Sequence, residues 1–156
     1  LMGWFFFGIG LMGQTLLHWT YYLPVQFWAW RQWTRGGDSG GELPVTSLTN
    51  GAKLIAVGAM AGFTLVLGWA LNAGWDSALY TYWDASIVAA SIIAMLLLSR
   101  KKVESWWLWI GPVNISAIAL YATTGAYMFA TLYVLFLVMA IVGLARWRFA
   151  SAARVA

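Results

Sequence analysis

Long apolar runs restrict the fold of this 156-residue chain more than any other feature of its sequence. An α-helix of about 20 residues crosses the ~30 Å hydrocarbon core of a bilayer. Only 9% of the residues are charged, whereas about a quarter are charged in a typical soluble domain. We therefore predict an all-α, multi-pass membrane protein. The predicted spans are 13–33, 51–72, 83–99, 104–122 and 127–147.

The basic residues are distributed asymmetrically along these spans. If every span crosses the membrane, all nine Lys and Arg residues fall on one face. The positive-inside rule then places the linker 34–50 and the tail 148–156 in the cytoplasm. Topology alone accounts for the net charge of +4, so we expect no nucleic-acid partner. The basic residues are Arg31, Arg35, Lys53, Arg100, Lys101, Lys102, Arg146, Arg148 and Arg154.

An internal repeat organises the predicted spans into bundles. Trp4, Gly8 and Trp30 recur 117 residues later as Tyr121, Gly125 and Trp147. The two copies run in the same direction, as in transporters built from parallel repeats. The repeat predicts three helices, a linker helix and three more helices, with roughly the first one and a half helices lacking before Leu1. Residues 1–33 are then the remainder of the first bundle, 51–72 the linker helix and 83–147 the second bundle.

Residues suited to catalysis or metal binding are scarce. The sequence has no cysteine and a single histidine, which excludes thiolate and multi-histidine metal sites. Asp76 and Asp84 both fall near one predicted surface, so no acid is paired with another inside the membrane. A hydrogen-bonded contact between helices explains His18 better than catalysis does. We therefore expect neither an enzyme nor a bound cofactor or metal.

The stretch 104–121 carries the strongest indication of a binding site. Trp106, Trp107 and Trp109 open a predicted helix that also contains Pro112 and Asn114. An unpaired polar group in hydrocarbon costs several kcal/mol, so the Asn114 amide should face a partner or a wet cavity. At helical spacing Trp107, Asn114 and Tyr121 are seven residues apart and share one stripe, which favours Trp107 as the stacking indole.

A comparable set lies in the first predicted span. It consists of Tyr22, Gln26 and Trp30, with Pro24 beside the glutamine. Amides bind neutral polar edges, and indoles stack on flat rings. The two sets together predict a small flat ligand that carries hydroxyls or an amide.

Several of these motifs resemble the nicotinamide riboside transporter family (PnuC). They are Tyr82-Trp83-Asp84, the run from Arg100 to Trp106, and Trp109, Asn114 and Tyr121. The resemblance implies a 3+1+3 fold similar to that of the SWEET transporters. It also implies facilitative uptake of nicotinamide riboside through the inner membrane by alternating access, a trimeric assembly, and trapping of the substrate by a cytoplasmic riboside kinase.

One spacing departs from the family pattern, and two other functions stay open. The family's asparagine follows the second tryptophan by four residues, whereas Asn114 follows Trp109 by five, so alignment on Asn114 matches Trp107 instead. One alternative is a transporter of another flat vitamin, thiamine or riboflavin. The other is a non-transporting membrane scaffold or fragment that packs through the GxxxG motif of Gly58 and Gly62.

Overall fold

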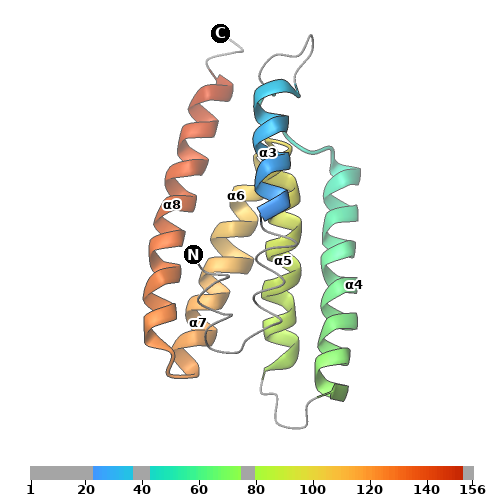
Figure 1. The fold of residues 1–156 in the computed structure, drawn as a ribbon, viewed down its shortest axis with the longest axis vertical. Coiled ribbons are helices and arrows are strands. Elements are labelled where there is room, and N and C mark those ends of the chain that lie inside the picture. Colours follow the sequence, from blue (N-terminus) through green and yellow to red (C-terminus); the bar gives the residue numbers. More distant parts are fainter. Residues whose placement is uncertain (1–22, 37–42, 75–79, 153–156) are drawn as a thin grey trace. The chain divides into compact units, whose positions relative to one another are not determined.

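The computed structural model describes residues 23–36, 43–74 and 80–152 of the chain. Every regular element in these residues is a helix, as Figure 1 shows, which confirms the predicted all-α class. The chain divides into two compact units, Leu1–Pro44 and Val45–Ala156, and each is described here by itself.

The described part of the first unit consists of helix α3 (Leu23–Arg35) and the residues that follow it. The helix extends past the predicted end of the span 13–33. Its last turn closes with the Gly36 N–H donating to the Gln32 carbonyl at 2.9 Å. The first ten residues of the predicted span, 13–22, lie outside the described residues.

The second unit begins with the predicted linker helix. Helix α4 (Asn50–Gly74) matches the prediction of 51–72 to within two residues at each end. The Thr49 hydroxyl accepts the Ala52 N–H at 3.3 Å, so Thr49 caps the helix, as expected for a threonine just before the first turn. Helix α5 (Thr81–Ser99) follows and packs along α4.

The core of this unit is built on small residues of α5. Ala85, Ala89 and Ala94 are almost fully buried, and such residues let neighbouring helices approach closely. The central apolar cluster joins α5 to the helix after it, and partly buried Met60, Trp83, Trp109, Tyr121 and Tyr133 surround it. The cluster consists of Ile87, Ala90, Val113, Ala117 and Leu120.

A helical segment covers the predicted span 104–122, but its middle is not α-helical. Helix α6 (Glu104–Leu108) leads into a π-helix, η3 (Trp109–Ile115), which continues as α7 (Ser116–Thr123). A tight turn follows, in which Gly125 has a positive φ of 74°, a conformation that glycine adopts without strain. Helix α8 (Tyr127–Ala152) then returns along the bundle.

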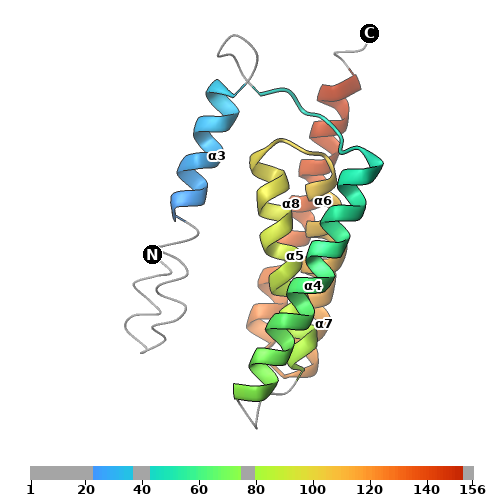
Figure 2. The same cartoon turned by 90° about the vertical axis from the view of Figure 1, so that its right-hand side faces the viewer.

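The helices of the second unit run side by side, and their basic ends coincide. Figures 1 and 2 show α4 and α6 beginning, and α5 and α8 ending, at the same end of this bundle. The described basic residues of this unit belong to these helix ends. Among the described residues, three helices are long and apolar enough to cross a membrane: Asn50–Ala73, Thr81–Ser99 and Tyr127–Phe149.

Candidate functional site

The π turn in η3 is the local feature that builds the candidate site. Pro112 lies inside it and has no N–H to donate to the helical ladder. The Ser116 N–H donates to the Gly111 carbonyl five residues earlier, the hydrogen-bond spacing of a π-helix. Such wide turns are rare and occur frequently at functional sites. The turn therefore changes which side chains share a face with Asn114.

Asn114 is buried in the middle of this helix without a hydrogen-bond partner. The residue is 1% exposed, and neither its amide nitrogen nor its amide oxygen makes a hydrogen bond. Leaving a buried donor or acceptor unpaired costs about 1–3 kcal/mol. A side chain that keeps two such atoms unpaired is suited to binding a polar ligand.

The other unpaired buried polar side-chain atoms in the described residues come from the same helix. Each of them lies within ten residues of Asn114, on three residues that precede the proline. They are the Ser105 hydroxyl oxygen and the indole nitrogens of Trp106 and Trp109. Nothing in the composition of the chain distinguished Ser105, and only its fully buried, unpaired hydroxyl identifies it. This concentration of unpaired groups defines the candidate site.

The three tryptophans of α6 and η3 lie in different surroundings. Trp107 is 50% exposed, and the Arg148 guanidinium lies over its ring at 5.3 Å, a cation–π contact. Trp109 packs instead against the central apolar cluster, which contains Val113, the neighbour of Asn114 in the chain. A π-helix has more residues per turn than an α-helix, so Trp109 lies closer to the side of Asn114 than α-helical spacing would place it. The stripe predicted for Trp107 assumed α-helical spacing, which this segment does not have.

Trp106 is held against α8 by ring packing. Its indole meets the Trp147 ring edge to face, with centroids 5.3 Å apart. A Cβ added at Gly143 would overlap the Trp106 ring, so glycine is what lets the indole approach the α8 backbone. Trp106 therefore has a clear packing role in addition to its unpaired indole N–H.

Tyr121 belongs to a cluster of aromatic rings near the other end of the helix. Its ring lies 5.4 Å from that of Tyr133 and 5.6 Å from that of Phe129. It also packs against the apolar cluster that contains Val113. Tyr121 and Trp109 thus both pack against the same apolar cluster.

Trp83 makes a hydrogen bond between helices that its position in the sequence does not indicate. Trp83 opens the predicted span 83–99 and is typical of the aromatic belt at a membrane surface. In the structure its indole N–H donates to the Ser116 hydroxyl at 2.6 Å. This bond joins α5 to the residue directly after the π turn, and no spacing rule in the sequence indicated it.

The residues predicted from the first half are partly described. Gln26 and Trp30 lie on α3 and are exposed within their own unit, and Tyr22 lies outside the described residues. Of the predicted residues in the second unit, the structure places Trp109 and Tyr121 against one apolar cluster and Trp106 and Trp107 elsewhere.

A cavity of about 390 Å³ lies between α4, α5 and the π turn. Its lining includes Met60, Thr64, Ser86, Pro112 and Ser116, but neither Trp109 nor Asn114. The cavity is therefore separate from the candidate site. In the described part of the chain, no group of three His, Cys, Asp or Glu residues is placed to hold a metal ion.

Known proteins match this chain over most of its length. The family model described as "Nicotinamide mononucleotide transporter" matches residues 1–149. The nicotinamide riboside transporter PnuC of Escherichia coli K12 is 32% identical over 68 residues, which are 44% of this chain and 28% of that protein. PnuC of Neisseria mucosa is 30% identical over 149 residues, which cover 88% of this chain and 55% of the relative.

A solved structure is similar as well. The crystal structure of the vitamin B3 transporter PnuC superimposes with a TM-score of 0.67 and 29% identity, covering 94% of this chain and 66% of that one. The chain thus spans less than two thirds of the length of each of these relatives. The resemblance seen in the sequence motifs is confirmed, as is the expectation of a transporter family and not an enzyme. The chain is a multi-pass membrane protein and belongs to the nicotinamide mononucleotide transporter family.

Proposed function

We propose that this chain forms part of a facilitative transporter that moves nicotinamide riboside across the membrane by alternating access. The buried, unpaired amide of Asn114 is the observation that carries the proposal. A riboside offers a carboxamide and ribose hydroxyls, and either could satisfy both atoms of the asparagine amide. The similar proteins are a nicotinamide riboside transporter and a vitamin B3 transporter, which supports the same ligand.

The charge of the surroundings favours a riboside over its phosphorylated form. The stretch between Lys102 and Arg146, which contains Asn114, includes no lysine or arginine. A phosphate group would need such a partner, because a buried anion must be paired. The nicotinamide ring of the riboside carries a positive charge, which the face of an indole such as Trp109 attracts. The proposed substrate is therefore the nucleoside and not the nucleotide.

The remaining parts of the proposal come from the sequence. Gln26, Trp30 and Tyr22 are proposed as further ligand-binding residues, because an amide and aromatic rings occur together in this stretch. The asymmetry of the basic residues supports a cytoplasmic location for the linker 34–50 and the C-terminus. We propose in addition a trimer in the inner membrane and trapping of the imported riboside by a cytoplasmic kinase, as the family resemblance implies.

A calorimetric titration tests the substrate. Purified protein should bind nicotinamide riboside, and Asn114→Ala should weaken binding by about tenfold or more, because a buried polar contact to the ligand is lost. Asn72→Ala is the matched control, since Asn72 is exposed on α4. No binding by the unmodified protein, or equal affinity in the Asn114 and Asn72 variants, would refute the proposal.

The same titration decides which indole stacks on the ligand. Trp109→Leu should weaken binding by about tenfold, because a buried ring contact to a cationic ring is removed. Trp107→Leu should leave the affinity within about twofold, since its ring is half exposed and covered by Arg148. A larger loss of affinity in Trp107→Leu than in Trp109→Leu would support Trp107 as the stacking indole, as the α-helical stripe predicted.

Other flat vitamins are separated by competition. Thiamine and riboflavin should displace labelled riboside only at concentrations far above the riboside's own dissociation constant, and so should nicotinamide mononucleotide. If one of these compounds displaces the riboside at a concentration near the riboside's own dissociation constant, that compound is the substrate and the proposal is wrong.

A non-transporting scaffold is the second candidate, and one observation favours it. A Cβ built at Gly58 or at Gly62 would meet no described atom within 4 Å, so this face of α4 is open for a partner helix. A scaffold needs no wet interior. A cysteine introduced at position 114 should then resist water-soluble thiol reagents, whereas a transporter should allow labelling that riboside blocks.

A further inference from the structure

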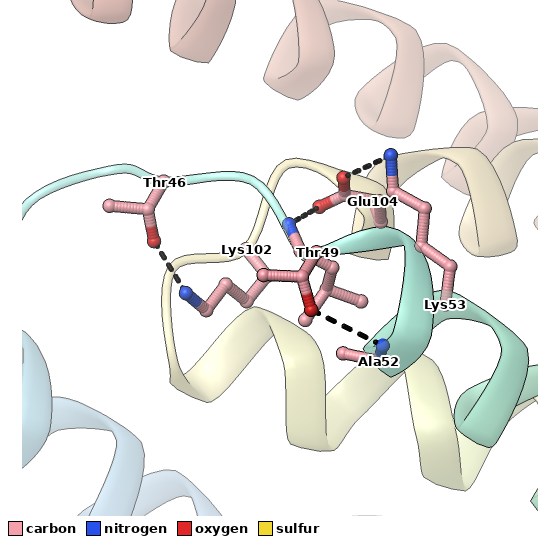
Figure 3. Close-up of polar contacts among 7 residues, drawn as sticks. Thr46, Thr49, Ala52, Lys53, Lys102 and Glu104 are labelled. Atoms are coloured by element: carbon pink, nitrogen blue, oxygen red, sulfur yellow. Dashed lines mark hydrogen bonds and ion pairs between the residues drawn. The ribbon is translucent and has the colours of Figure 1, made fainter.

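A polar clamp ties the segment before α4 to the loop between α5 and α6. It is formed by Thr46 and Leu48 on one side and by Lys101, Lys102 and Glu104 on the other, with Lys53 beside it. Figure 3 shows the side chains of Thr46, Lys53, Lys102 and Glu104 in this clamp. All of these residues belong to the second unit of the chain.

The clamp begins with the way α5 ends. The Lys101 N–H donates to Leu98 and the Lys102 N–H to Leu97, the paired bonds of a Schellman motif. Lys101 occupies the left-handed position with φ 49°, where glycine is usual. This turn presents the Lys101 carbonyl and the next N–H groups to the neighbouring segment.

The segment before α4 pairs with that turn as a short piece of parallel bridge. The Thr46 N–H donates to the Lys101 carbonyl at 3.1 Å, and the Val103 N–H donates to the Thr46 carbonyl at 3.0 Å. The Lys102 ammonium donates to the Thr46 hydroxyl at 2.7 Å (Figure 3).

Glu104 completes the clamp with both oxygens of its carboxylate. One accepts the Leu48 N–H at 3.0 Å, and the other pairs with the Lys53 ammonium at 3.3 Å (Figure 3). Glu104 is also the first residue of α6, so this carboxylate links the start of α4 to the start of the helix that carries Trp109 and Asn114.

This link is important for the position of α4 because few of the helix's residues are buried. Only 6% of the residues in the apolar stretch of α4 are buried, compared with 44% of those in α5. Away from the clamp α4 packs along α5, with Met60 against the central apolar cluster and Gly68 against the Tyr82 ring. Few residues of α4 are nevertheless buried, and the polar clamp fixes its first turn.

We propose that Glu104 is a positioning residue: its carboxylate locks the start of α4 to the start of α6, and so sets the position of the Trp109–Asn114 turn for the ligand. Its effect on the ligand rests on the proposed function. The lock itself does not, because it consists of the bonds that the Glu104 carboxylate makes with Leu48 and Lys53.

Hydrogen exchange followed by mass spectrometry tests the lock without any ligand. Glu104→Ala should speed exchange of the Leu48 amide and its neighbours in 45–53 by about tenfold or more, since a hydrogen bond to a carboxylate is lost. Glu104→Gln keeps an oxygen for the Leu48 N–H and should restore most of the protection. Lys53→Ala should have a small effect, because this exposed ion pair contributes little. Unchanged exchange in Glu104→Ala, or an equal effect of Lys53→Ala, overturns the lock.

Calorimetry with nicotinamide riboside tests the positioning. Glu104→Ala should weaken binding by about fivefold or more while Glu104→Gln binds almost as the unmodified protein does. Faster exchange with unchanged affinity overturns the positioning role. If the unmodified protein binds no riboside, the proposed function fails, whereas the exchange pattern still decides the lock. If Glu104→Ala does not fold, Glu104→Gln is compared with Lys53→Ala. A greater loss of affinity and of amide protection in Lys53→Ala than in Glu104→Gln overturns the proposal.

Discussion

The indole N–H of Trp83 in α5 donates to the hydroxyl of Ser116, 2.6 Å away, in the first residue of α7. The bond connects two helices at the point where the π turn ends and regular α-helix resumes. Ser116 also borders the cavity beside the π turn, so the bond fixes one wall of that cavity.

Ser116→Ala should destabilise the bundle by about 1–2 kcal/mol, because the part-buried Trp83 indole loses its acceptor. Thermal unfolding in detergent measures the change. Ser91→Ala is the control, since the Ser91 hydroxyl donates to the Ile87 carbonyl of its own helix and joins no second element. If the two variants lose the same amount of stability, the hydrogen bond between Trp83 and Ser116 contributes nothing to the stability of the bundle.

Gly143→Ala should displace the Trp106 ring from α8 and cost about 1–3 kcal/mol, because the added methyl group overlaps the indole. The shift should appear in tryptophan fluorescence and in the unfolding temperature. Gly62→Ala is the matched control, since a Cβ there meets no described atom within 4 Å. A Gly143 variant as stable as the Gly62 variant would contradict the packing seen between these helices.

Pro112→Ala should separate binding from stability. Alanine supplies the missing N–H and allows a regular α-helix, which would rotate Trp109 away from Asn114. We expect riboside binding to fall by about tenfold or more while the unfolding temperature stays the same or rises. Calorimetry and thermal unfolding of the same preparation measure both quantities. Unchanged affinity would mean that the π turn does not shape the site.

Single cysteines should reveal the sidedness of the bundle, since the chain has none of its own. Ser47 precedes α4 and Thr123 ends α7, and both are exposed. A membrane-impermeant maleimide should label Thr123→Cys in intact cells and Ser47→Cys only in inverted vesicles, because the basic residues favour a cytoplasmic linker. The opposite labelling pattern would reverse the proposed orientation.

The helices of the second unit could be predicted from the sequence because their lengths follow from a local rule. A bilayer of fixed thickness requires about 20 apolar residues per span, whatever their neighbours are. The bounds predicted for α4 and α5 consequently agree with the structure to within two residues. Helix α8 continues from the predicted end at 147 to 152, past the apolar run, and its last turns carry Arg146 and Arg148.

The candidate site could be predicted only in part. A polar amide in an apolar run identified Asn114, and the tryptophans near it identified the region. The choice among Trp106, Trp107 and Trp109 depended on α-helical periodicity, which the π turn around Pro112 changes. The sequence departs from the family spacing by one residue, and a wider turn accommodates one extra residue.

The sequence by itself determined that this chain is helical and spans a membrane, where its charges gather, and that Asn114 needs a partner. Those properties follow from hydrophobicity and from the cost of an unpaired polar group, which act residue by residue. Only the tertiary structure decided that Trp107 faces Arg148, that Trp83 bonds Ser116, and that Glu104 clamps the start of α4. These contacts join residues far apart in the chain, and hydrophobic patterning carries no information about which polar groups meet.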